Sequence, residues 1–197
     1  MQKEWIGNTK ATWSTVGASS HSSGERQGED FYATHPGAID ELLKREKFSP
    51  TVWECACGQG HLAKRLEEHG YDVYATDLYD RGYGTPGVDF LLQRESPVDT
   101  DIITNPPYRW ALDFSKHGLE LLRPEGKLAL FLRLQFLEGK ERYGFFAKAP
   151  PKLVYVFSYR AKCGINGIFD GKASAVCYAW FVWEKGYKGD PTMRWIN

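Results

Sequence analysis

The sequence predicts an α/β fold in which a mostly parallel sheet of seven strands ends in an antiparallel strand pair. Short β-rich runs alternate with amphipathic helical segments from residue 34 to residue 132, as in strand–helix–strand units of a parallel sheet. Two further β-rich runs, 152–157 and 175–183, close the chain and predict the antiparallel pair. The chain has 197 residues, 42% of them hydrophobic, which is enough to enclose one hydrophobic core.

The individual elements follow from local patterns. Pro36 suits the first position of a helix, and Ile39 and Leu42 then fall on one helical face. Gly70 ends a helix predicted over about 61–69, and a third helix is predicted over 111–122. The predicted strands are 51–57, 72–77, 88–90, 101–104, 127–132, 152–157 and 175–183.

The first thirty residues lack a hydrophobic period, and Gly17–Gly24 is a run of small and polar residues. We therefore expect residues 1–30 to form an N-terminal arm that can close over a ligand as a lid loop. Residues 31–197 are expected to form a single domain, with no separate domain for target recognition. Recognition would then come from loops, from a partner protein or from a second copy of the chain.

Composition excludes several classes of protein. No apolar run approaches the roughly 20 residues of a membrane-spanning helix, and the N-terminus lacks the apolar stretch of a signal peptide. Four cysteines are too few for a disulfide scaffold, and their spacing is not that of a zinc site. The sequence therefore predicts a cytoplasmic protein with free thiols, no metal and no membrane association.

The net charge is zero, with 25 Lys and Arg against 25 Asp and Glu, which argues against a strongly basic nucleic-acid clamp. The charge is nevertheless uneven. Residues 139–197 hold ten Lys and Arg against four Asp and Glu, a net charge of +6, and residues 1–138 carry −6. The basic C-terminal third is either a surface for nucleic acid or ordinary surface lysine.

A strand that ends in an acid and continues into a Gly-x-Gly turn occupies residues 54–60. Glycine lets the backbone approach a ligand because no side chain intervenes, although a plain strand-to-helix turn has the same appearance. Asp77 follows Gly60 by seventeen residues, where a carboxylate can accept hydrogen bonds from ribose hydroxyls. Asp89 and Phe90 offer an acceptor for an exocyclic amine and a face for a purine ring.

The kind of adenosine ligand follows from what the motif lacks. No third glycine follows Gly60 in the pattern of a dinucleotide site, and no Gly-x-x-x-x-Gly-Lys-Ser/Thr loop for a nucleoside triphosphate occurs. The remaining ligand class with an adenosine and no phosphate is S-adenosylmethionine.

The tetrapeptide Asn105-Pro106-Pro107-Tyr108 comes directly after the predicted strand 101–104. Two prolines hold the backbone extended, so the Asn105 side-chain oxygen and the Pro106 carbonyl can converge on one amino group. Tyr108 supplies a flat face on which a planar base or amide can stack. A proline turn that merely caps the strand is the structural alternative.

These segments together resemble the class I S-adenosylmethionine-dependent amino-methyltransferases, and most closely the phage or prophage DNA adenine-N6 methyltransferases. The resemblance rests on residues 30–36, 54–60, 77, 89–90 and 105–108, in that order. It implies a Rossmann-like seven-stranded methyltransferase fold, S-adenosylmethionine as cofactor, DNA as substrate, and a place in a bacterial or phage-infected cell. The catalytic residues it implies are Asn105, Pro106, Pro107 and Tyr108. The cofactor-binding residues it implies are Tyr32, Thr34, Glu54, Gly58, Gly60, Asp77, Leu78, Asp89, Phe90 and Asn105.

Substrate contacts are predicted beside the tetrapeptide and in the glycine-rich loop between the last two strands. They are Arg109, Lys162, Phe169 and Lys172, as phosphate-binding or stacking residues. Methylation of an RNA base or of a protein glutamine amide would use the same tetrapeptide chemistry. A catalytically silent nucleic-acid-binding module is a third interpretation, which the intact tetrapeptide disfavours.

Overall fold

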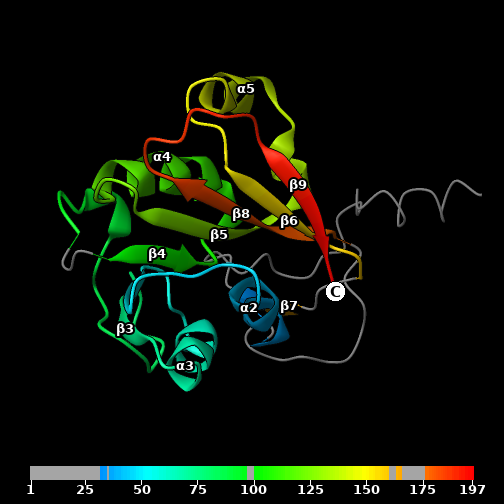
Figure 1. Cartoon of the computed structure of the whole chain (residues 1–197). Helices are drawn as coiled ribbons and strands as arrows, with labels where there is room; N and C mark the ends of the chain where they lie inside the picture. The colour runs from blue at the N-terminus through cyan, green and yellow to red at the C-terminus, as the bar shows by residue number, and fades with distance from the viewer. Residues whose placement is uncertain (1–31, 35, 97–99, 160–162, 166–175) are drawn as a thin grey trace, which may run out of the picture.

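The computed structural model describes residues 32–34, 36–96, 100–159, 163–165 and 176–197 (Figure 1). Its centre is a seven-stranded sheet with the strand order β3-β2-β4-β5-β8-β6-β9. The strands are β2 (Thr51–Glu54), β3 (Asp72–Ala75), β4 (Asp101–Thr104), β5 (Lys127–Arg133), β6 (Leu153–Phe157), β8 (Tyr178–Glu184) and β9 (Thr192–Ile196).

Most neighbouring strands of this sheet are parallel. β2 pairs in parallel with β3 and β4, β4 with β5, and β6 with β9. β8 alone among these strands runs the other way, and it is antiparallel to both β5 and β6. The predicted α/β class, with a mostly parallel sheet of seven strands and an antiparallel terminal part, is confirmed.

One of the seven strands of the sheet is formed by a different segment from the one predicted. Residues 88–90 were expected to form a strand, but Phe90–Leu92 is a 3-10 helix. The Asp89 side chain accepts a hydrogen bond from the Leu91 backbone N–H at 3.0 Å, which caps this helix and turns the chain out of an extended path. The seventh strand is instead β9, at the opposite edge of the sheet, which the sequence pattern did not indicate.

Helices cover both faces of the sheet (Figure 1). α2 (Pro36–Leu43) and α3 (His61–Glu68) pack on one face, where Ile39, Leu42 and Leu66 are fully buried. α4 (Ala111–Leu121) and α5 (Lys140–Phe146) pack on the other through apolar side chains such as Phe114. The predicted helices are thus confirmed, whereas α5 has no counterpart among the predictions.

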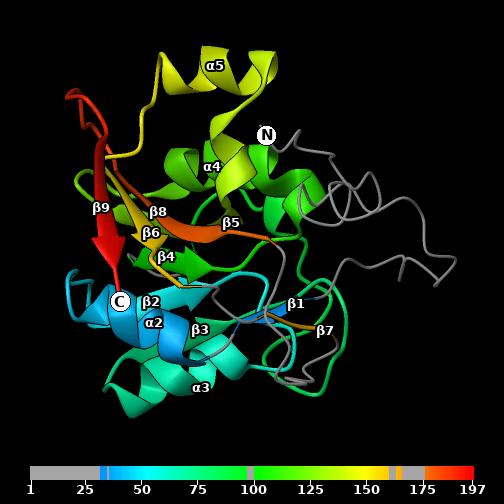
Figure 2. The ribbon, with the colours of Figure 1, turned by 90° about the vertical axis from the view of Figure 1, so that its right-hand side faces the viewer.

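A small antiparallel pair lies apart from the main sheet, near α3 in Figure 2. It joins β1 (Tyr32–Thr34) to β7 (Cys163–Ile165), with Thr34 opposite Cys163. The segment before α2 is therefore held against part of the predicted substrate loop. The predicted arm 1–30 and the predicted substrate residues Lys162, Phe169 and Lys172 lie outside the described residues.

The described residues contain neither a membrane-spanning helix nor a metal-binding cluster. None of the helices in the described ranges is both long enough and apolar enough to cross a membrane. The same ranges hold no group of three or more His, Cys, Asp or Glu side chains arranged to bind a metal ion.

Candidate active site

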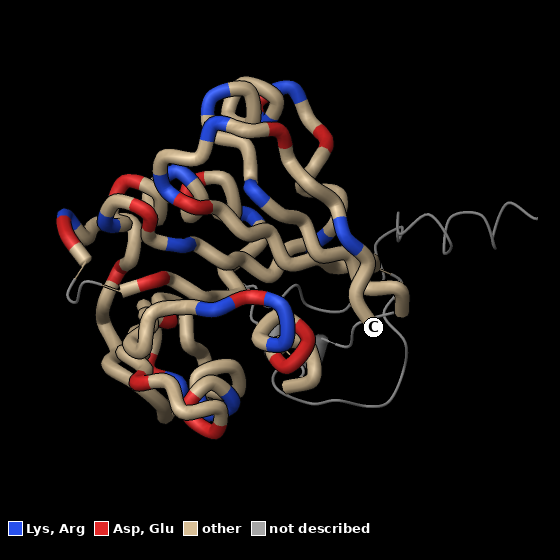
Figure 3. The backbone as a smooth tube through the Cα atoms, in the orientation of Figure 1, with Lys and Arg blue, Asp and Glu red and all other residues tan. Residues whose placement is uncertain are grey.

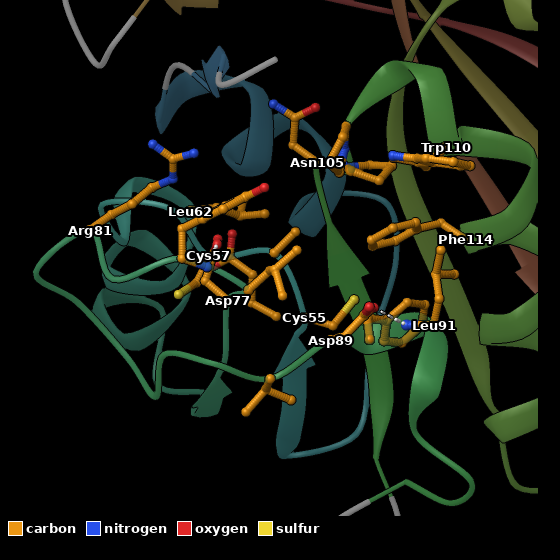
Figure 4. A pocket seen from close by; sticks show the side chains of 18 of the residues that line it. Cys55, Cys57, Leu62, Asp77, Arg81, Asp89, Leu91, Asn105, Trp110 and Phe114 are labelled. Atoms are coloured by element: carbon orange, nitrogen blue, oxygen red, sulfur yellow. Dashed lines mark hydrogen bonds between the residues drawn. The ribbon is translucent and has the colours of Figure 1, made fainter. Parts of the chain in front are cut away.

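A cavity of about 490 Å³ opens where β2, β3 and β4 end (Figure 4). The carboxyl ends of parallel strands all meet at this edge, which is where open α/β sheets bind ligands. Every residue that lines the cavity lies between Thr34 and Phe114. Many predicted site residues share its wall, namely Thr34, Glu54, Asp77, Leu78, Asp89, Phe90, Asn105, Pro106, Pro107, Tyr108 and Arg109.

Glu54 is the last residue of β2, and its side chain is almost completely buried. Burial raises the pKa of Glu54 well above its usual value, and the nearby Asp77 carboxylate raises it further. The backbone N–H of Ala63, in α3, hydrogen-bonds to the Glu54 carboxyl and opposes that rise. No donor from the described residues reaches Glu54 Oε2, nor does one reach the buried Thr34 hydroxyl on the same wall.

The two glycines of the turn shape the cavity without lining it. Gly58 has a φ of 56°, and its N–H donates to Asp77 Oδ2 at 2.8 Å. Gly60 caps α3 with a φ of 78°, and a Cβ built there would overlap the Tyr83 ring. Both positions therefore require a left-handed backbone, which glycine adopts without strain.

Asp77 follows β3 and fastens two loops to each other. Besides the Gly58 bond, its Oδ1 accepts from the Tyr79 backbone N–H at 2.9 Å. Asp77 is 7% exposed and lines the cavity, and each of its carboxylate oxygens can accept a further hydrogen bond. Leu78, the next residue, is 48% exposed and offers an apolar surface at the cavity.

Asp89 and Phe90 lie on the side of the cavity next to α4. The Asp89 cap, drawn as a dashed line in Figure 4, fixes its carboxylate at the cavity wall. The Phe90 ring stacks on Phe114 with centroids 4.7 Å apart and meets Trp53 edge-on at 5.2 Å. Phe90 is only 3% exposed, so it contributes to the core as well as to the cavity.

The tetrapeptide begins at the residue after β4 and enters a 3-10 helix (Tyr108–Trp110) that leads into α4. All four of its residues line the cavity. The Arg133 guanidinium, at the end of β5, lies 4.6 Å from the centroid of the Tyr108 ring. The Tyr178 ring is 6.0 Å from the same ring. Tyr108 is thereby held from the side of the neighbouring strands β5 and β8.

Some lining residues had no predicted role, among them Cys55, Cys57, Tyr79, Arg81, Leu92 and Phe114. Burial raises the pKa of Cys57 to about 12, so its thiol stays protonated and is not a nucleophile. His61 also lines the cavity, and burial lowers its pKa, which favours the neutral ring. Nothing in the sequence around Arg81 distinguishes it from a surface arginine.

Structural comparison finds this fold among solved methyltransferases. A type I restriction-modification methyltransferase subunit from Streptococcus thermophilus superposes with a TM-score of 0.62 and 15% identity, over 84% of this chain and 47% of that one. A putative RNA methyltransferase from Pyrococcus horikoshii gives 0.58 and 13%, over 91% and 99%. A putative class I S-adenosylmethionine-dependent methyltransferase from Listeria monocytogenes gives 0.52 and 14%, over 81% and 62%.

The chain has the class I methyltransferase fold. At identities of 13–15% the comparison speaks for the fold and for nothing finer. The chain spans about half the length of the type I subunit, so that protein has parts with no counterpart in this sequence. No family model matches the sequence, and no curated protein matches it.

Proposed function

We propose that this chain is an S-adenosylmethionine-dependent methyltransferase that modifies the exocyclic N6 amine of adenine in DNA. One observation carries the proposal. The Asn105–Tyr108 tetrapeptide opens at the end of β4 onto the same cavity as three acids, Glu54, Asp77 and Asp89. Residues 31–197 would form the catalytic unit, and a partner or a second copy would contribute sequence specificity.

The cavity suits S-adenosylmethionine by charge and by shape. The cofactor carries a cationic ammonium and sulfonium, and the acids line the cavity that would receive them. The buried Glu54 Oε2 and Thr34 hydroxyl, which no described residue satisfies, fit hydrogen-bond donors of an amino acid. Asp77 would accept from the ribose hydroxyls, Leu78 would pack on the adenine, and Asp89 with Phe90 would bind its amine and its ring.

Bound in this way, the cofactor would supply an electrophilic methyl group on sulfur. The Asn105 side-chain oxygen and the Pro106 carbonyl would accept the two hydrogens of the target amine. The nitrogen lone pair would then point at the methyl group, and Tyr108 would hold the planar base by stacking. Catalysis would come mainly from positioning, because the displacement needs no strong base before the nitrogen–carbon bond forms.

A DNA substrate is the finer part of the proposal. It is supported by the resemblance of the tetrapeptide segments to adenine-N6 methyltransferases and by the exposed aromatic and basic residues at the cavity. The Streptococcus thermophilus neighbour is a restriction-modification subunit, which agrees with DNA, and the Pyrococcus horikoshii neighbour is described as an RNA enzyme. The substrate therefore has to be decided by product analysis.

The deciding experiment incubates the protein with methyl-labelled S-adenosylmethionine and separate pools of DNA, RNA and protein. Label recovered as N6-methyladenine after digestion of the DNA to nucleosides is expected. If label appeared only in RNA or only in glutamine, that substrate would replace DNA in the proposal. If label appeared in no pool, the proposal that the chain is a methyltransferase would be contradicted.

The Asn105→Ala variant should lose at least about 100-fold in the rate of methyl transfer, because the amine loses one of its two acceptors. Cofactor affinity, measured by calorimetry, should stay within a few-fold of the parent. Asn197→Ala, outside the cavity, is the matched control. If Asn105→Ala lost cofactor binding and thermal stability together with activity, the tetrapeptide would be structural.

A further inference from the structure

Three arginine–aromatic pairs surround the cavity. The Arg81 guanidinium lies 5.4 Å from the centroid of the Tyr79 ring, that of Arg109 lies 5.6 Å from the Trp110 ring, and that of Arg133 lies 4.6 Å from the Tyr108 ring. All of these residues except Arg133 line the cavity. A guanidinium over a ring places a positive charge beside a flat apolar face.

Two of the three aromatic residues in these pairs are exposed. Tyr79 is 40% exposed and Trp110 is 45% exposed, and the neighbouring Leu92 is 75% exposed. Large apolar side chains at the mouth of a cavity mark a contact surface when they occur together. Arg109 is exposed as well, so its charge faces solvent beside the Trp110 ring.

Charge reverses between the interior of the cavity and its rim. The interior holds Glu54 and Asp77, which are 2% and 7% exposed, and it suits a cation. The rim holds Arg81 and Arg109, which suit an anion. One cavity thus has buried acidic groups in its interior and basic groups at its rim.

The rim pairs lie on both sides of the point where a target base would enter. In the view of Figure 4, Asn105 lies between Arg81 and Trp110. A polymer bound to both pairs would pass across the mouth of the cavity and would present one of its groups to Asn105. The rim thus suits the neighbours of the target group on a chain of repeating anionic, planar units.

We infer that this rim binds unpaired nucleotides on either side of the target base, so that the preferred substrate is single-stranded DNA. This inference rests on the proposed function and names its substrate more closely. An unpaired nucleotide offers both a phosphate for the arginine and a free base face for the ring. Inside a duplex the base faces are already stacked on one another, so only the phosphates would be used.

The test measures binding of a fluorescently labelled dT12 single strand by anisotropy, without cofactor. This oligonucleotide holds no adenine, so its binding does not depend on methyl transfer. We expect dT12 to bind at least about tenfold more tightly than the dA12–dT12 duplex. Trp110→Ala and Arg109→Gln should each weaken dT12 binding about tenfold, which is the usual size of a stacking contribution.

The control uses another Arg–aromatic dipeptide of the same chain. Arg142 and Tyr143 lie on α5, which contributes nothing to the cavity, and Tyr143 is 77% exposed. Arg142→Gln and Tyr143→Ala should leave dT12 affinity within about twofold. Circular dichroism of all variants checks that the fold is kept.

Several outcomes would overturn the inference. The duplex could bind as tightly as dT12 or more tightly. The Trp110→Ala and Arg109→Gln changes could leave dT12 affinity unchanged. Poly-glutamate of matched charge could displace labelled dT12 as well as unlabelled dT12 does. Failure of the proposed function looks different. A protein that binds dT12 through the rim but methylates no DNA would keep the binding of unpaired nucleotides by the rim and would lose the proposed reaction.

Discussion

Glu54 and Asp77 show how two acids of one cavity acquire different tasks. Asp77 accepts hydrogen bonds from the backbone N–H groups of Gly58 and Tyr79, and these bonds join two loops. Glu54 is more deeply buried, and burial raises its pKa. The Asp77 carboxylate thus connects two loops by hydrogen bonds and also lines the cavity. We therefore expect a cationic ligand to change the protonation of Glu54.

Cofactor binding should therefore depend on pH through Glu54. A cation beside Glu54 favours its ionised form, so binding releases a proton wherever the free protein holds that carboxyl protonated. Affinity for S-adenosylmethionine should rise by up to about tenfold per pH unit as the pH approaches the raised pKa of Glu54 in the free protein, and should level off above it.

Calorimetry in two buffers of different ionisation enthalpy measures the released proton directly. Glu54→Gln should abolish the release and weaken binding, whereas Glu141→Gln, on α5, should change neither. Binding that takes up a proton, or that ignores pH in the parent protein, would contradict the assignment of the cationic end to Glu54.

The same residue should make the unliganded protein less stable as pH rises. The folded-state pKa of Glu54 lies above the unfolded value, so between the two the folded chain binds more protons than the unfolded chain. The free energy of unfolding then falls with rising pH through this window, and the loss is complete above the folded-state pKa. Glu54→Gln cannot ionise, so its Tm should exceed that of the parent by a few degrees at pH values above the window.

Thermal unfolding without cofactor, followed from acid to neutral pH, checks this result. The difference in Tm should shrink toward zero at and below pH 4.5. A Tm lower than the parent's at every pH would mean that the Glu54 carboxyl is needed for packing, for example through its bond with the Ala63 N–H.

At the scale of elements, the sequence predicted what periodicity and turn residues encode. Helices 36–43, 61–68 and 111–121 and the strands of the sheet centre carry apolar side chains at helical or strand spacing. In β9, Met193 is 46% exposed and Trp195 is 70% exposed, and Ile196 at its end is the one buried residue, so the strand has no alternating pattern of burial. β1 and β7 are three residues each and pair across more than a hundred positions, which no local pattern encodes.

The site was predictable to the same extent and for the same reason. Acids and glycines at strand ends, such as Glu54, Gly60 and Asp77, were predictable because their spacing matches the ends of predicted strands, where such sheets bind ligands. Arg81 lies in the loop after β3 and Leu92 ends the 3-10 helix that follows, and both reach the cavity only through tertiary structure. Residues 88–90 have the composition of a strand, but the Asp89 side chain caps a 3-10 helix there, and strand periodicity does not encode such a cap.

The turn before α3 allows a matched test of a steric requirement. Gly60 and Gly70 both have a left-handed backbone, with φ of 78° and 86°. A Cβ at Gly70 meets nothing within 4 Å, whereas one at Gly60 overlaps the Tyr83 ring. Gly70→Ala should cost about 1–2 kcal/mol from backbone strain alone, and Gly60→Ala should cost more.

Denaturant unfolding gives both free energies. The additional loss in Gly60→Ala should be reduced when Tyr83→Ala is added, because the overlapping ring is then gone. Equal losses at the two glycines would show that Tyr83 moves aside without cost and that Gly60 serves only the backbone.

For the whole molecule, the charge asymmetry of the sequence and the position of the cavity do not coincide. Figure 3 shows Lys and Arg positions around α5 and the C-terminal strands. None of the described residues of 139–197 lines the cavity, although they include seven Lys and Arg. The arginines at or beside the cavity, Arg81, Arg109 and Arg133, belong to the part of the chain whose net charge is negative. A basic third of the sequence is therefore not the same feature as a basic site.

Salt dependence of DNA binding separates these two features. Each phosphate neutralised on a single strand contributes about −0.7 to the slope of log affinity against log salt concentration, so the two rim arginines, Arg81 and Arg109, predict a slope of about −1.4. If the seven described basic residues of 139–197 bound the strand as well, the slope would approach about −6. Arg109→Gln should make the slope shallower by about 0.7, and Arg142→Gln on α5 should leave it unchanged. A steep slope that Arg142→Gln reduces would move the DNA path from the mouth of the cavity to the α5 side of the sheet.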